Sequence, residues 1–271
     1  MPELPEVETV RRGLAPYLAG RRLLGARVRE PRLRWPVSAD LSQRVAGQRV
    51  LGLERRGKYL LMRLEQGGLL LHLGMSGSLQ RVRADTPPAR HDHLDLLLDD
   101  GACLRLHDPR RFGAVLWSAD PATHPLIAAL GVEPLTPAFD GARLHALSRG
   151  RKTAIKHFLM DAHQVVGVGN IYANEALFRA GVDPRLPAGR LSRPRCERLV
   201  GAIKATLLEA IEAGGSSLRD FVDSQGRHGW FQQSYFVYGR SGEPCRICGG
   251  TIRHLTQGAR STFLCNACQK R

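Results

Sequence analysis

Long apolar runs are missing from this 271-residue chain, because no stretch approaches the ~20 apolar residues that span a bilayer. The N-terminus carries acids and prolines and lacks the basic start and apolar run of a secretory signal. We therefore expect a cytoplasmic protein without a membrane partner. There is no internal repeat, and lysine is scarce, since only five of the 40 basic residues are lysines: Lys58, Lys152, Lys156, Lys204 and Lys270. Where arginine serves most charge needs, a lysine can mark a position that requires a compact, titratable amine, and we single out Lys58.

Acidic residues are also too few to balance the basic ones. The 25 Asp and Glu residues face 40 Lys and Arg residues, which leaves a net charge of +15 and a pI near 10.4. Such a chain repels itself unless its usual partner is a polyanion, and nucleic acid is the first candidate. A membrane surface is the alternative polyanion, but no segment pairs a concentrated basic face with a bulky apolar one.

The hydrophobic pattern of the first half predicts one helix followed by a β-sandwich. Residues 3–18 have apolar side chains at spacings of three and four, which is typical of an amphipathic helix. From about residue 23 to 118 the pattern is strand-like. Leucines alternate with other residues on both sides of a turn at Asp99-Asp100-Gly101, which predicts an antiparallel hairpin.

The second half is predicted to be helical. Residues 120–137 have the composition of a linker, and residues 140–213 have a helical pattern. Ser192 is a candidate N-cap for a helix that stops at Gly214-Gly215, and residues 214–230 are expected to form a loop. Together these patterns predict an α+β fold.

Six cysteines are present, of which Cys103 and Cys196 are isolated and interpreted as small buried apolar residues. The other four form two CxxC pairs separated by sixteen residues, the spacing of a zinc ribbon: Cys245, Cys248, Cys265 and Cys268. Disulfides do not suit the cytosol, and a redox CxxC would not need a second pair. We therefore predict one structural Zn²⁺ with no open coordination position. Residues 249–264 should form a basic hairpin with Arg260 near its tip.

The N-terminal Met1-Pro2-Glu3 has two interpretations. If the initiator Met is removed, Pro2 presents a secondary amine, and an α-amino group titrates near pH ~8, so a useful fraction is nucleophilic. Attack on a sugar C1′ would give an iminium, and Glu3 could protonate the opening sugar ring. The alternative is that prolines and acids simply decorate the start of a helix. From residues 2–6 alone, the second interpretation is favoured.

Five stretches and the cysteine module, in the same order along the whole chain, resemble bacterial formamidopyrimidine-DNA glycosylase. The stretches are Pro2–Thr9 (PELPEVET), Gly57–Leu61 (GKYLL), His72–Gly77 (HLGMSG), Asp108–Gly113 (DPRRFG) and Val165–Ala173 (VVGVGNIYA). The resemblance implies a β-sandwich domain at 1–130, a helix–two-turn–helix domain at 131–235 and a zinc finger at 236–271. It also implies a monomeric base excision repair enzyme that removes 8-oxoguanine and formamidopyrimidines from double-stranded DNA and then cleaves the strand by β,δ-elimination.

By the same resemblance, Pro2 is the nucleophile, Glu3 the acid and Glu6 a supporting carboxylate. Lys58 acts on the sugar and adjacent phosphate, and Asn170 and Arg260 hold the flanking phosphates, with Arg260 also linked to the second elimination. Further matched positions contact DNA or fill the space left by the flipped base: Met75, His91, Arg110, Phe112 and Arg151. Arg151 replaces a lysine of some members but keeps the charge. From the residues alone, Met75 and Phe112 are better interpreted as core, and the glycine turn before Asn170 could equally be a plain turn between helices.

Two alternatives remain open. An endonuclease VIII-like enzyme would favour oxidised pyrimidines, but such enzymes typically have Gly after the first Glu, where this chain has Leu4. A non-enzymatic DNA-binding protein would not need Pro2, Glu3 and Lys58 together. The region of residues 216–230 matches the segment that closes over the flipped base, and substrate preference is least defined there. We also expect the protein to associate with the nucleoid through DNA.

Overall fold

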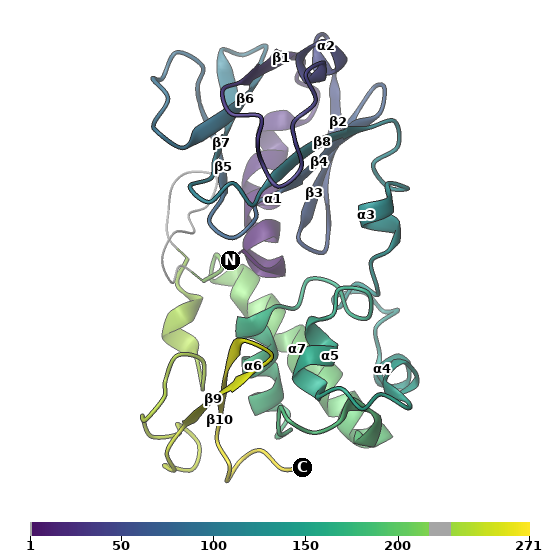
Figure 1. The fold of residues 1–271 in the computed structure, drawn as a ribbon, viewed down its shortest axis with the longest axis vertical. Helices are drawn as coiled ribbons and strands as arrows, with labels where there is room; N and C mark the ends of the chain where they lie inside the picture. The colour runs from purple at the N-terminus through teal and green to yellow at the C-terminus, as the bar shows by residue number, and fades with distance from the viewer. Residues whose placement is uncertain (1, 217–228) are drawn as a thin grey trace. The chain divides into compact units, whose positions relative to one another are not determined.

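The computed structural model describes residues 2–216 and 229–271, and the chain forms two compact units (Figure 1). Unit 1 comprises Met1–Ala129 and Ala213–Trp230, and unit 2 comprises Leu130–Glu212 and Phe231–Arg271. Helices and antiparallel sheets occur together, so the predicted α+β class is confirmed. No helix within the described residues has the length and apolar character that a membrane crossing requires.

Unit 1 begins with the predicted helix, α1 (Leu4–Leu18). Glu3 caps it, and its backbone N–H donates to Oε2 of Glu6 at 2.7 Å, which satisfies an amide that the helix itself leaves unpaired. The side chains spaced three and four apart all lie on the buried face: Val7, Val10, Leu14 and Leu18.

Two four-stranded antiparallel sheets follow, in the orders β1-β6-β7-β5 and β2-β3-β4-β8. Buried residues of α1 and of both sheets form one continuous hydrophobic core, as a sandwich requires. Two short helices, α2 (Leu41–Val45) and α3 (Pro125–Ala128), interrupt the regions expected to be strand-like and linker. They are too short to produce a recognisable helical period. The strands are β1 (Leu23–Val28), β2 (Val50–Arg56), β3 (Tyr59–Leu64), β4 (Gly68–His72), β5 (Ser78–Arg83), β6 (Asp92–Leu98), β7 (Ala102–His107) and β8 (Ala114–Ser118).

The predicted hairpin is the β6–β7 pair, in which Leu96 faces Leu104 and Gly101 has a φ of +78° in the turn. The alternation of leucines buries one face, but Asp95 is fully buried on the other. Arg105 lies directly across from Asp95 and donates to it from Nε at 2.8 Å, so the buried carboxylate is paired.

Unit 2 is helical, with α4 (Gly141–Ser148), α5 (Ile155–Met160), α6 (Asn170–Arg179) and α7 (Arg193–Glu212). α7 starts one residue after the predicted cap Ser192 and ends before Gly214 and Gly215, both of which have positive φ. α7 packs against α4 and α6, and α6 also packs against α5. Helix α6 also contacts the C-terminal hairpin.

That hairpin consists of β9 (Arg253–Gln257) and β10 (Arg260–Leu264). Gly258 and Ala259 both have positive φ, as a two-residue turn between antiparallel strands requires. Arg260 is therefore the first residue after the turn, as predicted, and it pairs with Gln257. A small apolar cluster that includes Phe178, Ile252 and Phe263 anchors the hairpin to α6.

Candidate active site and nucleic-acid interface

The N-terminal carboxylates are buried beside Pro2, which is itself buried. Glu3 and Glu6 are each only 2% exposed. Oε2 of Glu6 accepts from the Glu3 amide at 2.7 Å, and Oε1 of Glu6 accepts from the Ser216 amide at 2.8 Å. One carboxylate thus holds the start of the chain against a segment 210 residues away in sequence.

Lys58 lies in the tight turn between β2 and β3, next to Gly57, whose φ is +58°. The turn is tied to α1 through Arg55, which donates to Glu8 Oε2 at 3.0 Å and to the Gly57 carbonyl at 3.2 Å. α1 also packs against β2 and β3. Unit 1 therefore carries both Lys58 and the N-terminal carboxylates on elements that contact each other.

His72, at the end of β4, is a neutral group beside this lysine. Burial of the imidazole, followed by the positive charges of Lys58 and Arg34, lowers the pKa of His72 to about 4. The unprotonated Nδ1 of His72 accepts a hydrogen bond from the Gly74 amide at 3.0 Å. A protonated ring could not accept this bond, so the hydrogen bond at the start of the loop that carries Met75 requires neutral His72.

The residues expected to fill the space left by the flipped base in the DNA duplex are exposed rather than buried. Met75 is 38% exposed and Phe112 is 42% exposed, so their interpretation as core residues is wrong. The guanidinium of Arg110 lies over the Phe112 ring, 4.8 Å from its centroid. Whether a turn residue is buried depends on the direction in which the folded loop points it, and a hydrophobic pattern does not record that direction.

His91 is half-buried in unit 1, with its ring 6.2 Å from that of His93. Partial burial and the charge of Arg90 lower the pKa of His91. In unit 2, Arg151 is exposed, and its backbone is held by hydrogen bonds with Ser148 and Gly189.

Unit 2 brings together the two residues expected to hold phosphates. Asn170 is the first residue of α6, and its Nδ2 donates to the carbonyl of Ser261 at 3.1 Å, directly next to Arg260. Gly167, with a φ of +86°, and Gly169, in an extended conformation, form the turn before this helix. Helix N-termini favour anions, and Asn170 is the half-buried residue at this one, whereas residues 165–169 are buried.

Sequence reasoning missed the residues that fix this arrangement. Lys156 is fully buried, and its Nζ donates to the Ser261 carbonyl at 2.7 Å and to Thr262 Oγ1 at 2.6 Å. Asn174 Oδ1 accepts from the amide of Phe263 at 2.8 Å. The scarcity of lysine that singled out Lys58 applied equally to Lys156, so that signal could have found it.

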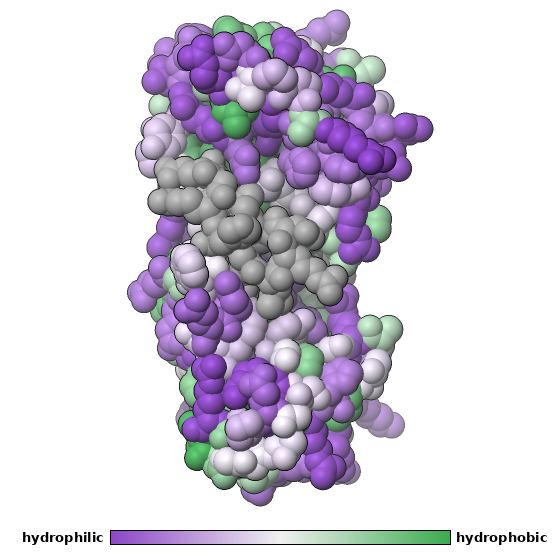
Figure 2. Space-filling view, turned by 90° about the vertical axis from the view of Figure 1, so that its left-hand side faces the viewer, coloured by the Kyte–Doolittle hydropathy of each residue, from purple (hydrophilic) through white to green (hydrophobic). Residues whose placement is uncertain are grey.

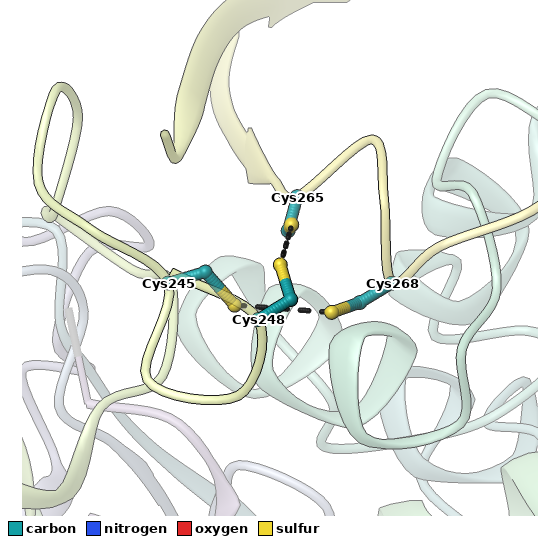
Figure 3. A group of neighbouring side chains, drawn as sticks. All are labelled: Cys245, Cys248, Cys265 and Cys268. Carbon is teal, nitrogen blue, oxygen red and sulfur yellow. Dashed lines mark hydrogen bonds between the residues drawn. The ribbon is translucent and has the colours of Figure 1, made fainter. Parts of the chain in front are cut away.

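The four module cysteines converge on one point (Figure 3). Their sulfurs lie within 4.8 Å of one another, with Cys245 and Cys268 at 3.8 Å and Cys248 and Cys265 at 3.4 Å. A tetrahedral ion with Zn–S bonds of about 2.3 Å places its sulfurs about 3.8 Å apart, so the donor set fits zinc. The cluster holds one structural zinc, which braces the hairpin that carries Arg260.

The comparisons with known proteins agree along the chain. Residues 1–115 match the formamidopyrimidine-DNA glycosylase N-terminal domain, residues 130–222 the H2TH domain of the same enzyme, and residues 242–271 a zinc finger found in FPG and IleRS. Formamidopyrimidine-DNA glycosylases of Methylococcus capsulatus and Stutzerimonas stutzeri are 56% and 57% identical, over 100% of both chains in each case.

Two solved structures extend this likeness to the fold. The MutM (Fpg) protein of Thermus thermophilus is 39% identical, with a TM-score of 0.88 over 99% of this chain and 98% of that one. An Fpg mutant of Lactococcus lactis, in complex with DNA containing Fapy-dG, is 32% identical, with a TM-score of 0.92 over 100% of both chains.

The sandwich, the H2TH domain and the zinc finger together define a DNA repair glycosylase. The chain belongs to the formamidopyrimidine-DNA glycosylase family. It is accordingly a base excision repair enzyme that acts on oxidised purines, and lyase activity is part of the family. The endonuclease VIII-like and non-enzymatic alternatives are not favoured.

Proposed function

We propose that Pro2 of the processed chain is the nucleophile of this glycosylase. The nitrogen lone pair of Pro2 bonds to C1′ of the damaged nucleotide, and the bond from C1′ to the base breaks, so that the base leaves with that electron pair and takes up a proton. Pro2 then loses its N–H proton, and as Glu3 protonates the sugar oxygen and the C1′–O bond breaks, the nitrogen lone pair forms an iminium with C1′. Loss of a C2′ proton then expels the 3′ phosphate, and in a second elimination loss of the C4′ proton expels the 5′ phosphate.

The observation that supports this proposal is the pair of buried carboxylates beside Pro2. Because Oε2 of Glu6 accepts from the Glu3 amide and its Oε1 from the Ser216 amide, Glu6 fixes the backbone on which Glu3 and Pro2 are carried. Glu6 therefore acts as a support, and Glu3 transfers the proton. A buried, preorganised acid next to the nucleophile suits a reaction in which charge develops on the sugar.

The remaining assigned residues bind DNA. Lys58, on its tight turn, contacts the sugar and the adjacent phosphate. Asn170 and Arg260, held together through Ser261, bind the phosphates that flank the flipped nucleotide, and Arg260 assists the second elimination. Two further positions contact DNA from their own units: His91 and Arg151.

Met75, Arg110 and Phe112 fill the space that the flipped base leaves in the duplex. Their exposure permits this role, because a side chain buried in the protein core could not enter the duplex. The segment expected to close over the flipped base falls largely on residues 217–228, which lie outside the described residues.

We also propose that the protein acts as a monomer in the cytoplasm, where it is associated with the nucleoid through DNA. On the face shown in Figure 2, hydrophilic residues predominate and hydrophobic ones are scattered among them. Together with the net charge of +15, such a surface suits a soluble protein whose partner is DNA.

Borohydride trapping on duplex DNA that contains 8-oxoguanine tests the nucleophile, because an iminium is reduced to a stable covalent adduct. The native chain, shown by mass spectrometry to begin at Pro2, should give the adduct. A chain with an N-terminal extension that blocks the amine should give none, whereas Lys58→Ala should still give it. An adduct that persists in the blocked chain but disappears in Lys58→Ala would assign the nucleophile to the lysine instead.

A further inference from the structure

Two loops of unit 1 hold exposed apolar side chains at the same end of neighbouring strands. The first, residues 73–77, joins β4 to β5 and carries Met75; the second, residues 108–113, joins β7 to β8 and carries Phe112. β4 pairs with β8, and β5 pairs with β7, so each loop links the same two sheets. The two loops therefore emerge next to each other.

One buried carboxylate connects these loops. Asp108 is fully buried at the start of the second loop, and its Oδ2 accepts from the Gly113 amide at 2.7 Å, which closes that loop on itself. Its Oδ1 accepts from the hydroxyl of Ser76, the neighbour of Met75, at 3.2 Å. The Asp108 carbonyl lies 2.8 Å from Nε2 of the buried His93, so the base of the second loop is also held from β6.

The two backbones also touch. A Cβ atom added at Gly74 would lie 2.4 Å from the carbonyl carbon of Phe112 and 2.7 Å from its oxygen, so only glycine permits this approach. Within the second loop, Arg111 has a φ of +56°, a conformation that non-glycine residues rarely adopt. Such geometry persists only where its surroundings enforce it, and here the Asp108 hydrogen bonds close the turn around it.

We propose that Asp108 and Ser76 are positioning residues that lock the Met75 and Phe112 loops into one preformed wedge. Neither side chain touches DNA in this role; each acts through the loop that it holds. The inference rests on the proposed function, in which Met75 and Phe112 fill the vacancy left by the flipped base. Side chains that are held in place before binding lose less freedom on insertion, and a small misplacement of such groups slows the reaction strongly.

The test compares two substrates that differ in their need for a wedge. Excision of 8-oxoguanine from a duplex requires the vacancy to be filled, whereas strand cleavage at a preformed abasic site in single-stranded DNA does not. Asp108→Ala and Ser76→Ala should slow duplex excision by roughly 10- to 100-fold and change single-strand cleavage by less than about twofold. Asp108→Asn, whose amide can accept from Gly113 and donate to Ser76, should restore most of the duplex activity.

Asp120→Ala is the matched control, because Asp120 also accepts a backbone N–H, from Ala122 at 3.0 Å, but at an exposed position. It should leave both activities unchanged. Unchanged duplex excision in the Asp108→Ala and Ser76→Ala variants would overturn the inference, and so would an equal loss on both substrates, which indicates general damage to the fold. If Asp108→Ala does not fold, Ser76→Ala decides between these outcomes. A native protein that excises nothing from the duplex would instead overturn the proposed function.

Discussion

Replacing His72 with Asn should remove a pH-dependent loss of stability. In the folded protein burial, aided by the charges of Lys58 and Arg34, lowers the pKa of His72 to about 4, against an ordinary value of 6.5. Between these two pH values, His72 is therefore protonated in the unfolded chain but neutral in the folded chain. Above pH 6.5 His72 imposes no penalty on the free energy of folding. The penalty grows as the pH falls towards 4, because only the unfolded chain is then protonated at this histidine.

The size of the effect follows from the shift. One pKa unit corresponds to about 1.4 kcal/mol, so between about pH 7.5 and pH 4.5 the native chain should lose about 2.5 kcal/mol more than His72→Asn. Asn suits the test because its Oδ1 can still accept the Gly74 amide but cannot take up a proton in this range. Urea unfolding at a series of pH values measures the difference.

His163→Asn serves as the control, because it makes the same substitution at a side chain that is 70% exposed and keeps His72, so the loss of stability in acid should persist. An NMR titration of His72 provides an independent measurement. A midpoint near 6.5, or parallel stability curves for the native chain and His72→Asn, would refute the assignment of a buried, neutral imidazole at this position.

Four other perturbations have expected outcomes. Glu175→Ala leaves three backbone amides, of residues 236–238, without the carboxylate that accepts from them at 2.8–3.0 Å, and should cost about 2–5 kcal/mol of stability in urea unfolding. Glu209→Ala removes an ion pair whose carboxylate is 50% exposed and should cost under about 1 kcal/mol. Equal losses of stability in the two variants would contradict the role given to the Glu175 carboxylate. Chelation of the zinc should unfold the hairpin and weaken DNA binding in fluorescence anisotropy, and unchanged affinity after verified metal loss would argue against this role. Log Kd should rise steeply with log salt concentration, since DNA binding by phosphate contacts releases counterions. A Kd that does not change with salt would exclude phosphate contacts.

The structural features that depend on residues close together in the sequence were predicted correctly. The helix at the N-terminus, the β6–β7 hairpin, the helix after Ser192 and the paired cysteines all depend on spacings of a few residues. Within such distances the backbone geometry alone decides which side chains share a face or can meet at one ion. The family resemblance also rests on such stretches, and it supplied the roles proposed for Pro2, Glu3 and Lys58.

The distant partners of the supporting residues could not be predicted in this way. Glu6 meets Ser216, Lys156 meets Thr262 and Asp108 meets Ser76, and these pairs are separated by 210, 106 and 32 residues. A polar residue that will be buried and paired looks, in the sequence, like any solvated polar residue. Its partner is chosen only when packing removes water from both groups and the unpaired alternative becomes costly.

The amino-acid sequence by itself determined the class of the fold and the zinc ligands, and it led to the proposed chemistry of the N-terminus, because each of these rests on short motifs. Only the tertiary structure decided that Met75 and Phe112 are exposed, that His72 is neutral, and that buried polar groups hold the turns that carry the proposed DNA-binding side chains. The direction of a loop and the dielectric around a side chain are set by contacts between segments that are distant in the sequence. Those contacts exist only in the folded chain.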